Sequence, residues 1–168
     1  ALAMRALITG DADPARRLEA LAVLDTAIEA MIRGQWLDLE FEQRDEVDVD
    51  EYLAMVAGKT GAMLGASLEI GAILAGSDRE TAAALGDWGR QVGLAFQARD
   101  DYLGIWGDPA QTGKSNVNDL QRKKKTLPVV LALRHPRVGP SLRRAYASAE
   151  LSEREARDLA TEMRAAGI

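Results

Sequence analysis

The sequence predicts an all-α protein. Apolar residues recur at intervals of three and four along almost the whole chain, and the alternating runs of β-branched and aromatic residues that mark strands are missing. The 168 residues are 47% hydrophobic and 28% charged, a composition that excludes disorder and allows one core. The lack of cysteine and the single histidine, His135, exclude a disulfide framework, a thiolate nucleophile and the common zinc sites.

The charge balance limits the partners that the chain can bind. A net charge of −5 disfavours general attraction to nucleic acid or to an anionic membrane surface. The longest apolar stretch, 61–76, is interrupted by Glu69 and is shorter than the roughly 20 residues that cross a bilayer. No segment near the N-terminus has the pattern of a secretion signal. We therefore expect a cytoplasmic protein with no transmembrane segment and no nucleic-acid partner.

The first helical segments are separated by a turn. A short helix over Leu2–Ile8 leads into a Gly-Asp-Ala-Asp-Pro sequence, in which Pro14 suits the first turn of the next helix. That helix should run from about Ala15 to Gln43. Its apolar face comprises Leu18, Leu21, Leu24, Ile28, Met31 and Ile32.

A third helix should begin after Asp48. The side chain of Asp48 can accept the free amide protons of the first turn, and Glu51 completes a capping box. The helix should end near Gly76. Four glycines within it each cost about 1 kcal/mol relative to alanine, which indicates close helix packing or a nearby substrate. They are Gly58, Gly61, Gly65 and Gly71.

Ser77 and Glu80 repeat the capping-box pattern and predict a further long helix that ends at about Trp106. Apolar and aromatic side chains cover most of its circumference, so we expect it to be largely buried. This helix carries the polar residues that are the main candidates for a functional site.

The remainder of the chain should be a loop followed by shorter helices. The segment 107–125 has turn residues and little apolar periodicity, and helix resumes near Leu127. A break is expected over 136–140, followed by two helical segments, the second opened by a capping box of Ser152 and Glu155.

Near the end of the long helix, Gln97, Asp100 and Asp101 are spaced so that they share one helical face. Two adjacent carboxylates in a buried setting repel each other and are costly to desolvate unless a cation compensates. A set of carboxylates without His or Cys favours Mg²⁺. From the spacing alone, a solvated acidic patch or an ion pair with Arg99 is the more common explanation.

Cationic residues follow this helix and also precede it. Lys114 and the run 122–125 share a loop with Asp119, but without a strand or the full glycine spacing they do not form a P-loop. By itself the run is more typical of a solvated face or a nucleic-acid patch. Lys59 and Thr60 place a cation beside a hydroxyl in the glycine-rich helix, and a surface lysine with its stem along the helix is equally possible there.

Together these residues resemble a known family. The stretch 93–103 and the four pieces Gly107-Asp108-Pro109, Thr112-Gly113-Lys114, Asp119 and Lys124-Lys125-Thr126-Leu127-Pro128 closely resemble the second aspartate-rich region of trans-isoprenyl diphosphate synthases. Gly34-Gln35 with Asp38, and Lys59-Thr60, resemble two earlier motifs of that family in the right order.

The resemblance implies an antiparallel helix bundle of the isoprenoid synthase type around a central cavity. It implies a Mg²⁺-dependent prenyltransferase that condenses an allylic prenyl diphosphate with isopentenyl diphosphate and gives a longer prenyl diphosphate of the farnesyl or geranylgeranyl class. It also implies a homodimer. The metal and lysine charges would stabilise the departing pyrophosphate.

The resemblance assigns roles to individual residues. Asp100 and Asp101 would bind the metal, and Asp119 would orient the lysines or a metal-bound water. Diphosphate binding and catalysis would fall to Lys59, Thr60, Lys114 and Lys124. Gln97 would also be catalytic, and it would line the substrate cavity together with Gln35 and Phe96.

Two departures from the family pattern are visible. Gly104 stands where the second motif often has a third aspartate, and the first aspartate-rich motif is absent from these 168 residues. We therefore expect residues 1–168 to form a partial isoprenoid synthase domain, the second half of the bundle, that does not catalyse prenyl transfer alone. A class I terpene cyclase, a non-catalytic homologue acting as a regulatory subunit and a purely structural bundle remain alternatives.

Overall fold

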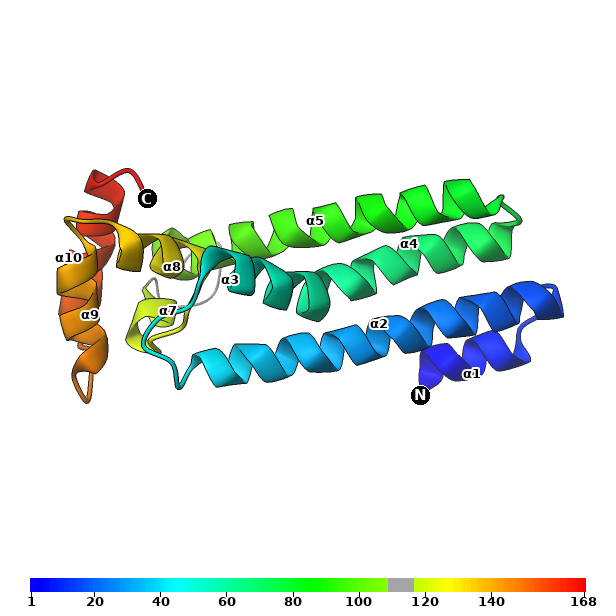
Figure 1. Ribbon diagram of the computed structural model, residues 1–168, viewed down its shortest axis with the longest axis horizontal. Coiled ribbons are helices and arrows are strands. Elements are labelled where there is room, and N and C mark those ends of the chain that lie inside the picture. The colour runs from blue at the N-terminus through cyan, green and yellow to red at the C-terminus, as the bar shows by residue number, and fades with distance from the viewer. Residues whose placement is uncertain (109–116) are drawn as a thin grey trace. The chain divides into compact units, whose positions relative to one another are not determined.

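The computed structural model of the protein describes residues 1–108 and 117–168, and every regular element in these two ranges is helical, as predicted (Figure 1). The chain divides into two compact units. Unit 1 comprises Ala1–Leu37 and Ala54–Phe96, and unit 2 comprises Asp38–Leu53 and Gln97–Ile168. Each unit has an apolar cluster of its own, where the sequence had suggested one core.

The helices follow the predicted order closely. Their bounds are α1 Leu2–Thr9, α2 Pro14–Phe41, α3 Val49–Val56, η1 Ala57–Gly61, α4 Ala62–Ala75, α5 Arg79–Trp106, α7 Asn118–Gln121, α8 Leu127–Arg134, α9 Gly139–Ala147 and α10 Glu153–Ala165. The predicted loop after α5 contains the short helix α7. No helix of the described residues is long and apolar enough to cross a membrane.

Helix caps agree with the sequence at one end of the chain and differ in the middle. Ser152 and Glu155 form the predicted reciprocal capping box on α10. The predicted cap at Ser77 is wrong, because Asp78 Oδ1 accepts the backbone N–H of Thr81 over 2.8 Å and α5 begins one residue later. Ser77 and Asp78 both have side chains that can cap a helix, and a carboxylate is at least as good a cap as a hydroxyl.

The predicted glycine-rich helix is interrupted by one π-helical turn, η1, which the sequence did not predict. At this turn the backbone of η1 contacts α2: a Cβ atom built on Gly34 would lie 2.3 Å from the backbone N of Lys59. The extra residue of a π turn is a local distortion that is often retained at functional sites. Here it carries Lys59 and Thr60.

Unit 1 is held together by small residues. Within it α2, α4 and most of α5 run side by side (Figure 1). A Cβ atom on Gly93 would lie 2.6 Å from the Cα of Gly61, and one on Gly89 would lie 2.8 Å from the Cα of Gly65. The predicted close packing is thus confirmed for α4 and α5, whereas a Cβ atom on Gly71 would meet nothing within 4 Å.

Helix α5 is less buried than predicted. Phe96 is 60% exposed and Tyr102 is 45% exposed, whereas Ile105 is 1% exposed. The prediction failed because the glycines of α5, including Gly89 and Gly93, form its closest contacts with the neighbouring helix. Several of its large apolar side chains are therefore left exposed.

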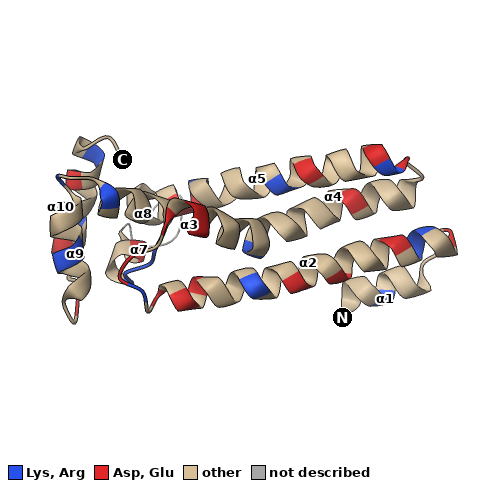
Figure 2. Cartoon of the chain, in the orientation of Figure 1, with Lys and Arg blue, Asp and Glu red and all other residues tan. Residues whose placement is uncertain are grey.

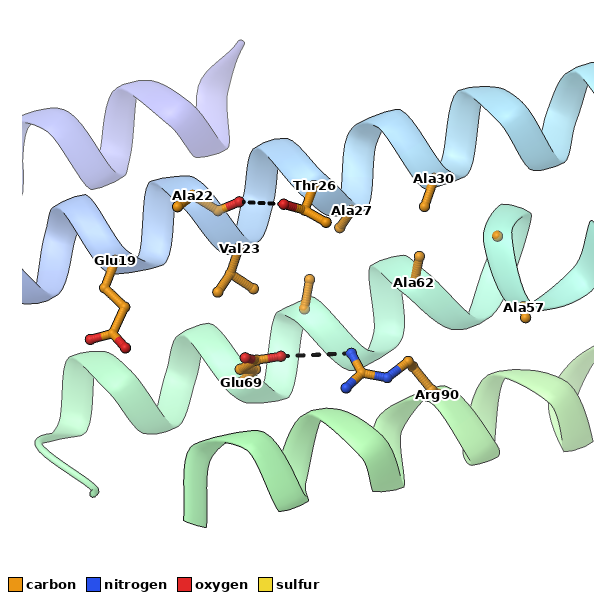
Figure 3. Close-up of a pocket in the computed structure, with 12 residues that line it drawn as sticks. Glu19, Ala22, Val23, Thr26, Ala27, Ala30, Ala57, Ala62, Glu69 and Arg90 are labelled. Carbon is orange, nitrogen blue, oxygen red and sulfur yellow. Dashed lines mark hydrogen bonds and ion pairs between the residues drawn. The ribbon is translucent and has the colours of Figure 1, made fainter. Parts of the chain in front are cut away.

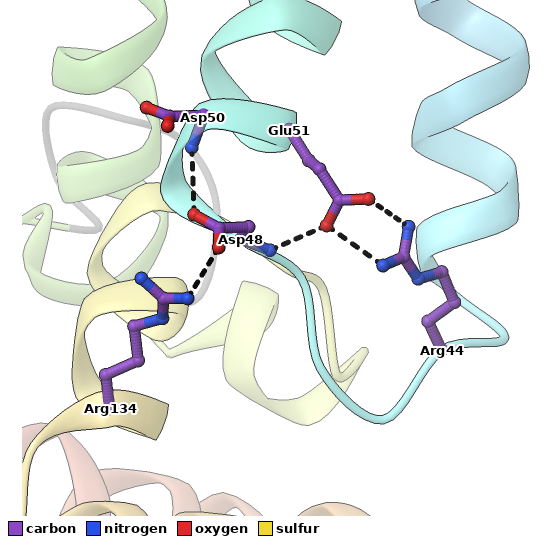
Figure 4. A network of polar contacts seen from close by, with 5 residues as sticks. All are labelled: Arg44, Asp48, Asp50, Glu51 and Arg134. Carbon is purple, nitrogen blue, oxygen red and sulfur yellow. Dashed lines mark hydrogen bonds and ion pairs between the residues drawn. The ribbon is translucent and has the colours of Figure 1, made fainter.

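Unit 2 has a larger apolar core and more polar ties. Its core includes Ile105, Val129 and Leu142. The connection from α2 to α3 is fastened at its two sides (Figure 4). Arg44 donates two hydrogen bonds of 2.8 and 2.9 Å to Glu51, which pairs the connection with the first turn of α3.

The second fastening of this connection reaches α8. Asp48 Oδ2 accepts from Arg134 Nη2 over 2.7 Å, and Glu51 Oε2 accepts the backbone N–H of Asp48 as the predicted capping box requires. Acidic and basic residues are interspersed along α2 and α5 as well (Figure 2), so the net charge of −5 is not confined to one helix.

Candidate functional site

Helix α5 presents its two adjacent aspartates to different surroundings. Asp100 is exposed, whereas Asp101 is buried, with 5% of its surface exposed. Successive residues of an α-helix differ in direction by about 100°, so one can face solvent while the next faces the core. The expectation that both acids are buried is therefore wrong for Asp100. No ion pair joins Arg99 to either acid in the ranges that the structure describes.

Both carboxylate oxygens of Asp101 are engaged in hydrogen bonds. Oδ1 accepts from Gln97 Nε2 over 2.9 Å, the contact that the spacing predicts. Oδ2 accepts from the hydroxyl of Tyr52 over 2.5 Å and from the backbone N–H of Leu127 over 2.8 Å. A buried carboxylate is stable when such donors replace its water.

Sequence reasoning missed Tyr52 and the amide of Leu127. Tyr52 is 2% exposed, and a buried tyrosine hydroxyl needs a partner. A tyrosine on the apolar face of the helix that carries Lys59 was therefore a usable signal. The amide of Leu127 left no signal, because every residue except proline has one.

Burial dominates the electrostatics of this pair. Desolvation raises the pKa of Asp101 above its ordinary value, and the hydrogen bonds from Tyr52, Leu127 and Gln97 act in the opposite direction. Desolvation also raises the pKa of Tyr52, and the charges of Asp101 and Asp38 raise it further. The tyrosine hydroxyl therefore stays protonated and remains a donor to the carboxylate.

A second carboxylate, Asp119, occupies the space beside Gly104. Asp119 is 8% exposed, and a Cβ atom built on Gly104 would lie 2.0 Å from its Oδ2. A side chain at position 104 would therefore collide with this carboxylate, which accounts physically for the glycine. Asp119 Oδ1 lies 3.5 Å from Lys124 Nζ, so these two predicted site residues are brought together.

The other predicted residues lie in unit 1 or outside the described ranges. Lys59 and Thr60 are half-buried in η1, and Gln35 is exposed on α2, next to the glycine that contacts η1. Phe96 is exposed, and it is the last residue of the second segment of unit 1. Lys114 lies outside the residues that the structure describes.

Unit 1 also contains a cavity of about 640 Å³. Alanine side chains of α2, η1 and α4 form much of its lining (Figure 3). Arg90 Nη1 lies 3.6 Å from Glu69 Oε2 in the same lining. Ala57 and Gly58, at the other end, belong to the same turn as Lys59 and Thr60.

Of the two adjacent carboxylates on α5, one offers an exposed oxygen donor for a divalent cation. Within 1–108 and 117–168, no group of three or more His, Cys, Asp or Glu side chains could enclose an ion. Mg²⁺ usually keeps several waters and is held by one or two carboxylates together with substrate phosphates. Asp100, an exposed hard oxygen donor, fits that requirement, whereas the oxygens of Asp101 already accept hydrogen bonds.

Comparison with known proteins connects this arrangement to named relatives. The model of the polyprenyl synthetase family matches residues 1–163. Over 116 residues the chain is 50% identical to a (2E,6E)-farnesyl diphosphate synthase of Mycobacterium tuberculosis, covering 69% of this chain and 32% of that protein. Over 127 residues it is 47% identical to a geranylgeranyl diphosphate synthase of the same organism, covering 76% and 36%.

Solved structures show the same similarity. A polyprenyl synthetase from Streptomyces coelicolor A3(2) superposes with a TM-score of 0.84 at 42% identity, over 90% of this chain and 47% of that one. A geranylgeranyl pyrophosphate synthetase from Pyrococcus horikoshii Ot3 gives a TM-score of 0.82 at 31% identity, over 98% and 49%. The chain thus spans about a third of these curated relatives and about half of these solved chains.

Proposed function

Because this chain belongs to the polyprenyl synthetase family, we propose that it forms the second half of a Mg²⁺-dependent prenyltransferase site. The reaction would condense an allylic prenyl diphosphate with isopentenyl diphosphate to give a longer prenyl diphosphate. Relatives named as farnesyl and geranylgeranyl diphosphate synthases support this reaction class. The same comparisons give no support to the alternatives of a terpene cyclase or a regulatory subunit.

The observation that carries the proposal is the exposed carboxylate of Asp100 beside the buried carboxylate of Asp101, both of whose oxygens accept hydrogen bonds. Asp100 would hold Mg²⁺, which, when bound, would neutralise charge on the diphosphate and assist its departure. Asp101 was assigned to the metal by family resemblance, and its three hydrogen bonds favour a supporting role instead. Asp100 would thus be the principal metal ligand of this half.

Cationic side chains would bind the diphosphate itself. Lys124 Nζ lies 3.5 Å from the buried carboxylate of Asp119, which would orient its ammonium. Lys59 and Thr60, carried by the π turn η1, would add a second cation and a hydroxyl donor, and Lys114 would add a third cation. Such groups stabilise the developing charge of the leaving pyrophosphate.

Cavity-lining residues would hold the hydrocarbon part of the substrate. Phe96 and Gln97 would line the cavity near the reacting carbons, and Gln35 would be a further pocket residue. The alanine-lined cavity of unit 1 would accept the prenyl chain, because its lining includes residues of the turn that carries Lys59 and Thr60. Breaking of the carbon–oxygen bond would release pyrophosphate and leave an allylic cation. Attack by the double bond of isopentenyl diphosphate would then form the new carbon–carbon bond, and transfer of a proton to the pyrophosphate would complete the product.

Family resemblance extends the proposal to a homodimer, and sedimentation of the purified chain would test the dimer. A cytoplasmic location is proposed from the sequence pattern. We further propose that the 168-residue chain binds Mg²⁺ and pyrophosphate but does not catalyse prenyl transfer alone. Within 1–108 and 117–168, no three or more His, Cys, Asp or Glu side chains are grouped so that they could hold a metal ion by themselves. Detectable transfer by the purified chain would contradict this part of the proposal.

A chimera tests the activity directly. The 116-residue segment of the M. tuberculosis farnesyl diphosphate synthase that matches this chain would be replaced by the residues of this chain. We expect elongation of geranyl diphosphate by labelled isopentenyl diphosphate, lost on Asp100→Asn. Turnover that needs no isopentenyl diphosphate would indicate a cyclase. A folded chimera without turnover would support a non-catalytic homologue and overturn the proposal.

A further inference from the structure

We propose that Tyr52 is a positioning residue that, through Asp101, fixes the lysine-bearing segment before α8 relative to helix α5. This inference rests on the proposed function, because it concerns the same Mg²⁺ and pyrophosphate site. It assigns no direct contact with ligand to Tyr52. Its basis is one buried carboxylate shared by residues from three segments of unit 2.

The first step is the way in which α8 begins. Thr126 occupies the N-cap position of α8 but makes no capping hydrogen bond, and its hydroxyl is buried without a hydrogen-bond partner. The amide of Leu127, the first residue of α8, instead donates a hydrogen bond of 2.8 Å to Asp101 Oδ2. A carboxylate from α5 therefore caps α8 in place of the local side chain, and its charge suits the positive end of the helix.

The second step is the orientation of that carboxylate. Asp101 Oδ2 receives the hydroxyl of Tyr52 as well as the amide of Leu127, whereas Gln97 holds the other oxygen. Tyr52 is 2% exposed and Asp101 is 5% exposed, so water cannot readily replace a lost donor. The hydroxyl from α3 thus determines where the cap of α8 lies.

The third step connects this cap to the proposed ligand-binding groups. Asp100 precedes Asp101 by one residue, and Lys124 precedes Leu127 by three. The backbone N–H of Lys124 donates to the carbonyl of Asp119 over 3.0 Å, so its segment is tied at that point also. The Asp101–Leu127 hydrogen bond is therefore one direct tie between the backbone that carries Asp100 and the backbone that carries Lys124.

The test compares pyrophosphate affinity with stability in three variants. Tyr52→Phe removes only the hydroxyl. Leu127→Pro replaces the amide hydrogen by a ring carbon, at a helix position that accepts proline after the extended Thr126, so it removes the donor and pushes Asp101 Oδ2 away from the start of α8. Val130→Ala, a fully buried change in α8, is the matched control because it lowers stability without touching a hydrogen bond to Asp101.

We expect Tyr52→Phe and Leu127→Pro to weaken the binding of inorganic pyrophosphate, titrated in the presence of Mg²⁺, by about tenfold, the effect of one hydrogen bond to a charged group. Val130→Ala should lower the melting temperature at least as much and leave the affinity unchanged. Wild-type affinity in Tyr52→Phe, or an equal loss in Val130→Ala, would overturn the inference.

Hydrogen exchange separates this inference from the proposed function. Failure of the wild-type chain to bind pyrophosphate would count against the proposed function, and exchange of the Leu127 amide would then decide the positioning role. Tyr52→Phe should speed that exchange more than it speeds exchange at the buried amides of α9, and a uniform change would overturn the inference.

Discussion

Unit 1 and unit 2 are stabilised in different ways. Unit 1 brings helix backbones into contact at glycines such as Gly34 and Gly93 and leaves an alanine-lined cavity between its helices. Unit 2 joins its segments through a buried carboxylate and through ion pairs such as Asp48 with Arg134. Helix α5 contributes to both units, with glycines in its first part and the aspartates near its end.

The difference shows how one helix can serve two purposes. Where two helix backbones touch at glycines, no larger residue fits at those positions. Such a contact needs no buried polar side chain and therefore no hydrogen-bond partner for one. A buried carboxylate requires donors from each segment around it, and those donors then fix the segments. Space for an apolar chain and positioning of charged groups thus come from different residue types.

Adding one methyl group to unit 1 should have the largest effect on stability. Gly34→Ala places a Cβ atom 2.3 Å from the backbone N of Lys59, so we expect a loss of about 3 kcal/mol or failure to fold. Urea unfolding would measure it. The matched control is Gly71→Ala, where a Cβ atom meets nothing within 4 Å, and it should gain about 0.5–1 kcal/mol from helix propensity. Equal effects at the two glycines would refute the packing described for unit 1.

Removing the carboxylate of unit 2 should have the next largest effect. Asp101→Ala leaves the hydroxyl of Tyr52 and the amide of Leu127 buried without an acceptor, and we expect a loss of about 2 kcal/mol. Asp100→Ala changes an exposed residue and should alter the free energy of unfolding by less than about 0.5 kcal/mol. Similar losses for the two variants would show that Asp101 does not hold unit 2 together.

A local cap in unit 2 should contribute less than the buried carboxylate. Ser152→Ala removes the hydroxyl that accepts the backbone N–H of Glu155 in the capping box of α10, keeps the backbone N–H that donates to Glu155, and should cost about 1 kcal/mol. Ser67→Ala is the matched control, because the hydroxyl of Ser67 donates only to the carbonyl one turn earlier in α4. Thermal unfolding of both variants would show whether the cap is worth more than an ordinary helical serine.

Acid should loosen the ion pairs of unit 2 by a smaller amount. The guanidinium of Arg44 lowers the pKa of Glu51, and the amide of Asp50 together with Arg134 lowers the pKa of Asp48. A lowered folded-state pKa contributes stability above the ordinary carboxyl value of about 4, and that stability is lost as the pH falls through the lowered value. The double variant Asp48→Asn with Glu51→Gln should therefore show a shallower loss of melting temperature below about pH 4. Parallel acid curves would contradict this.

Sequence reasoning predicted the elements well because their signals are local. Apolar spacing located α2 and α5, and Ser152 with Glu155 located the start of α10. The π turn was not predicted from the sequence. In the structure it lies where the backbone of η1 approaches Gly34 of α2. That contact joins residues far apart in the sequence.

The candidate site was predicted in type but not in division of roles. The pattern identified Gln97, Asp100 and Asp101 as a polar group, and the contact of Gln97 with Asp101 is present. Sequence spacing could not predict that Asp100 is exposed and Asp101 is buried. The environment of Asp101 depends on Tyr52 and Leu127, which are distant in the sequence. Likewise Gly104 stands where the family pattern often has a metal ligand, whereas in the structure the carboxylate of Asp119 occupies the space beside it.

The separate roles of the neighbouring acids are tested most directly by calorimetric titration of pyrophosphate in the presence of Mg²⁺. We predict that Asp100→Asn weakens binding by about 100-fold relative to the wild-type chain, since it removes the proposed metal ligand. Its free energy of unfolding should stay within about 0.5 kcal/mol of the wild-type value. Wild-type affinity in Asp100→Asn would show that the exposed aspartate does not hold the metal.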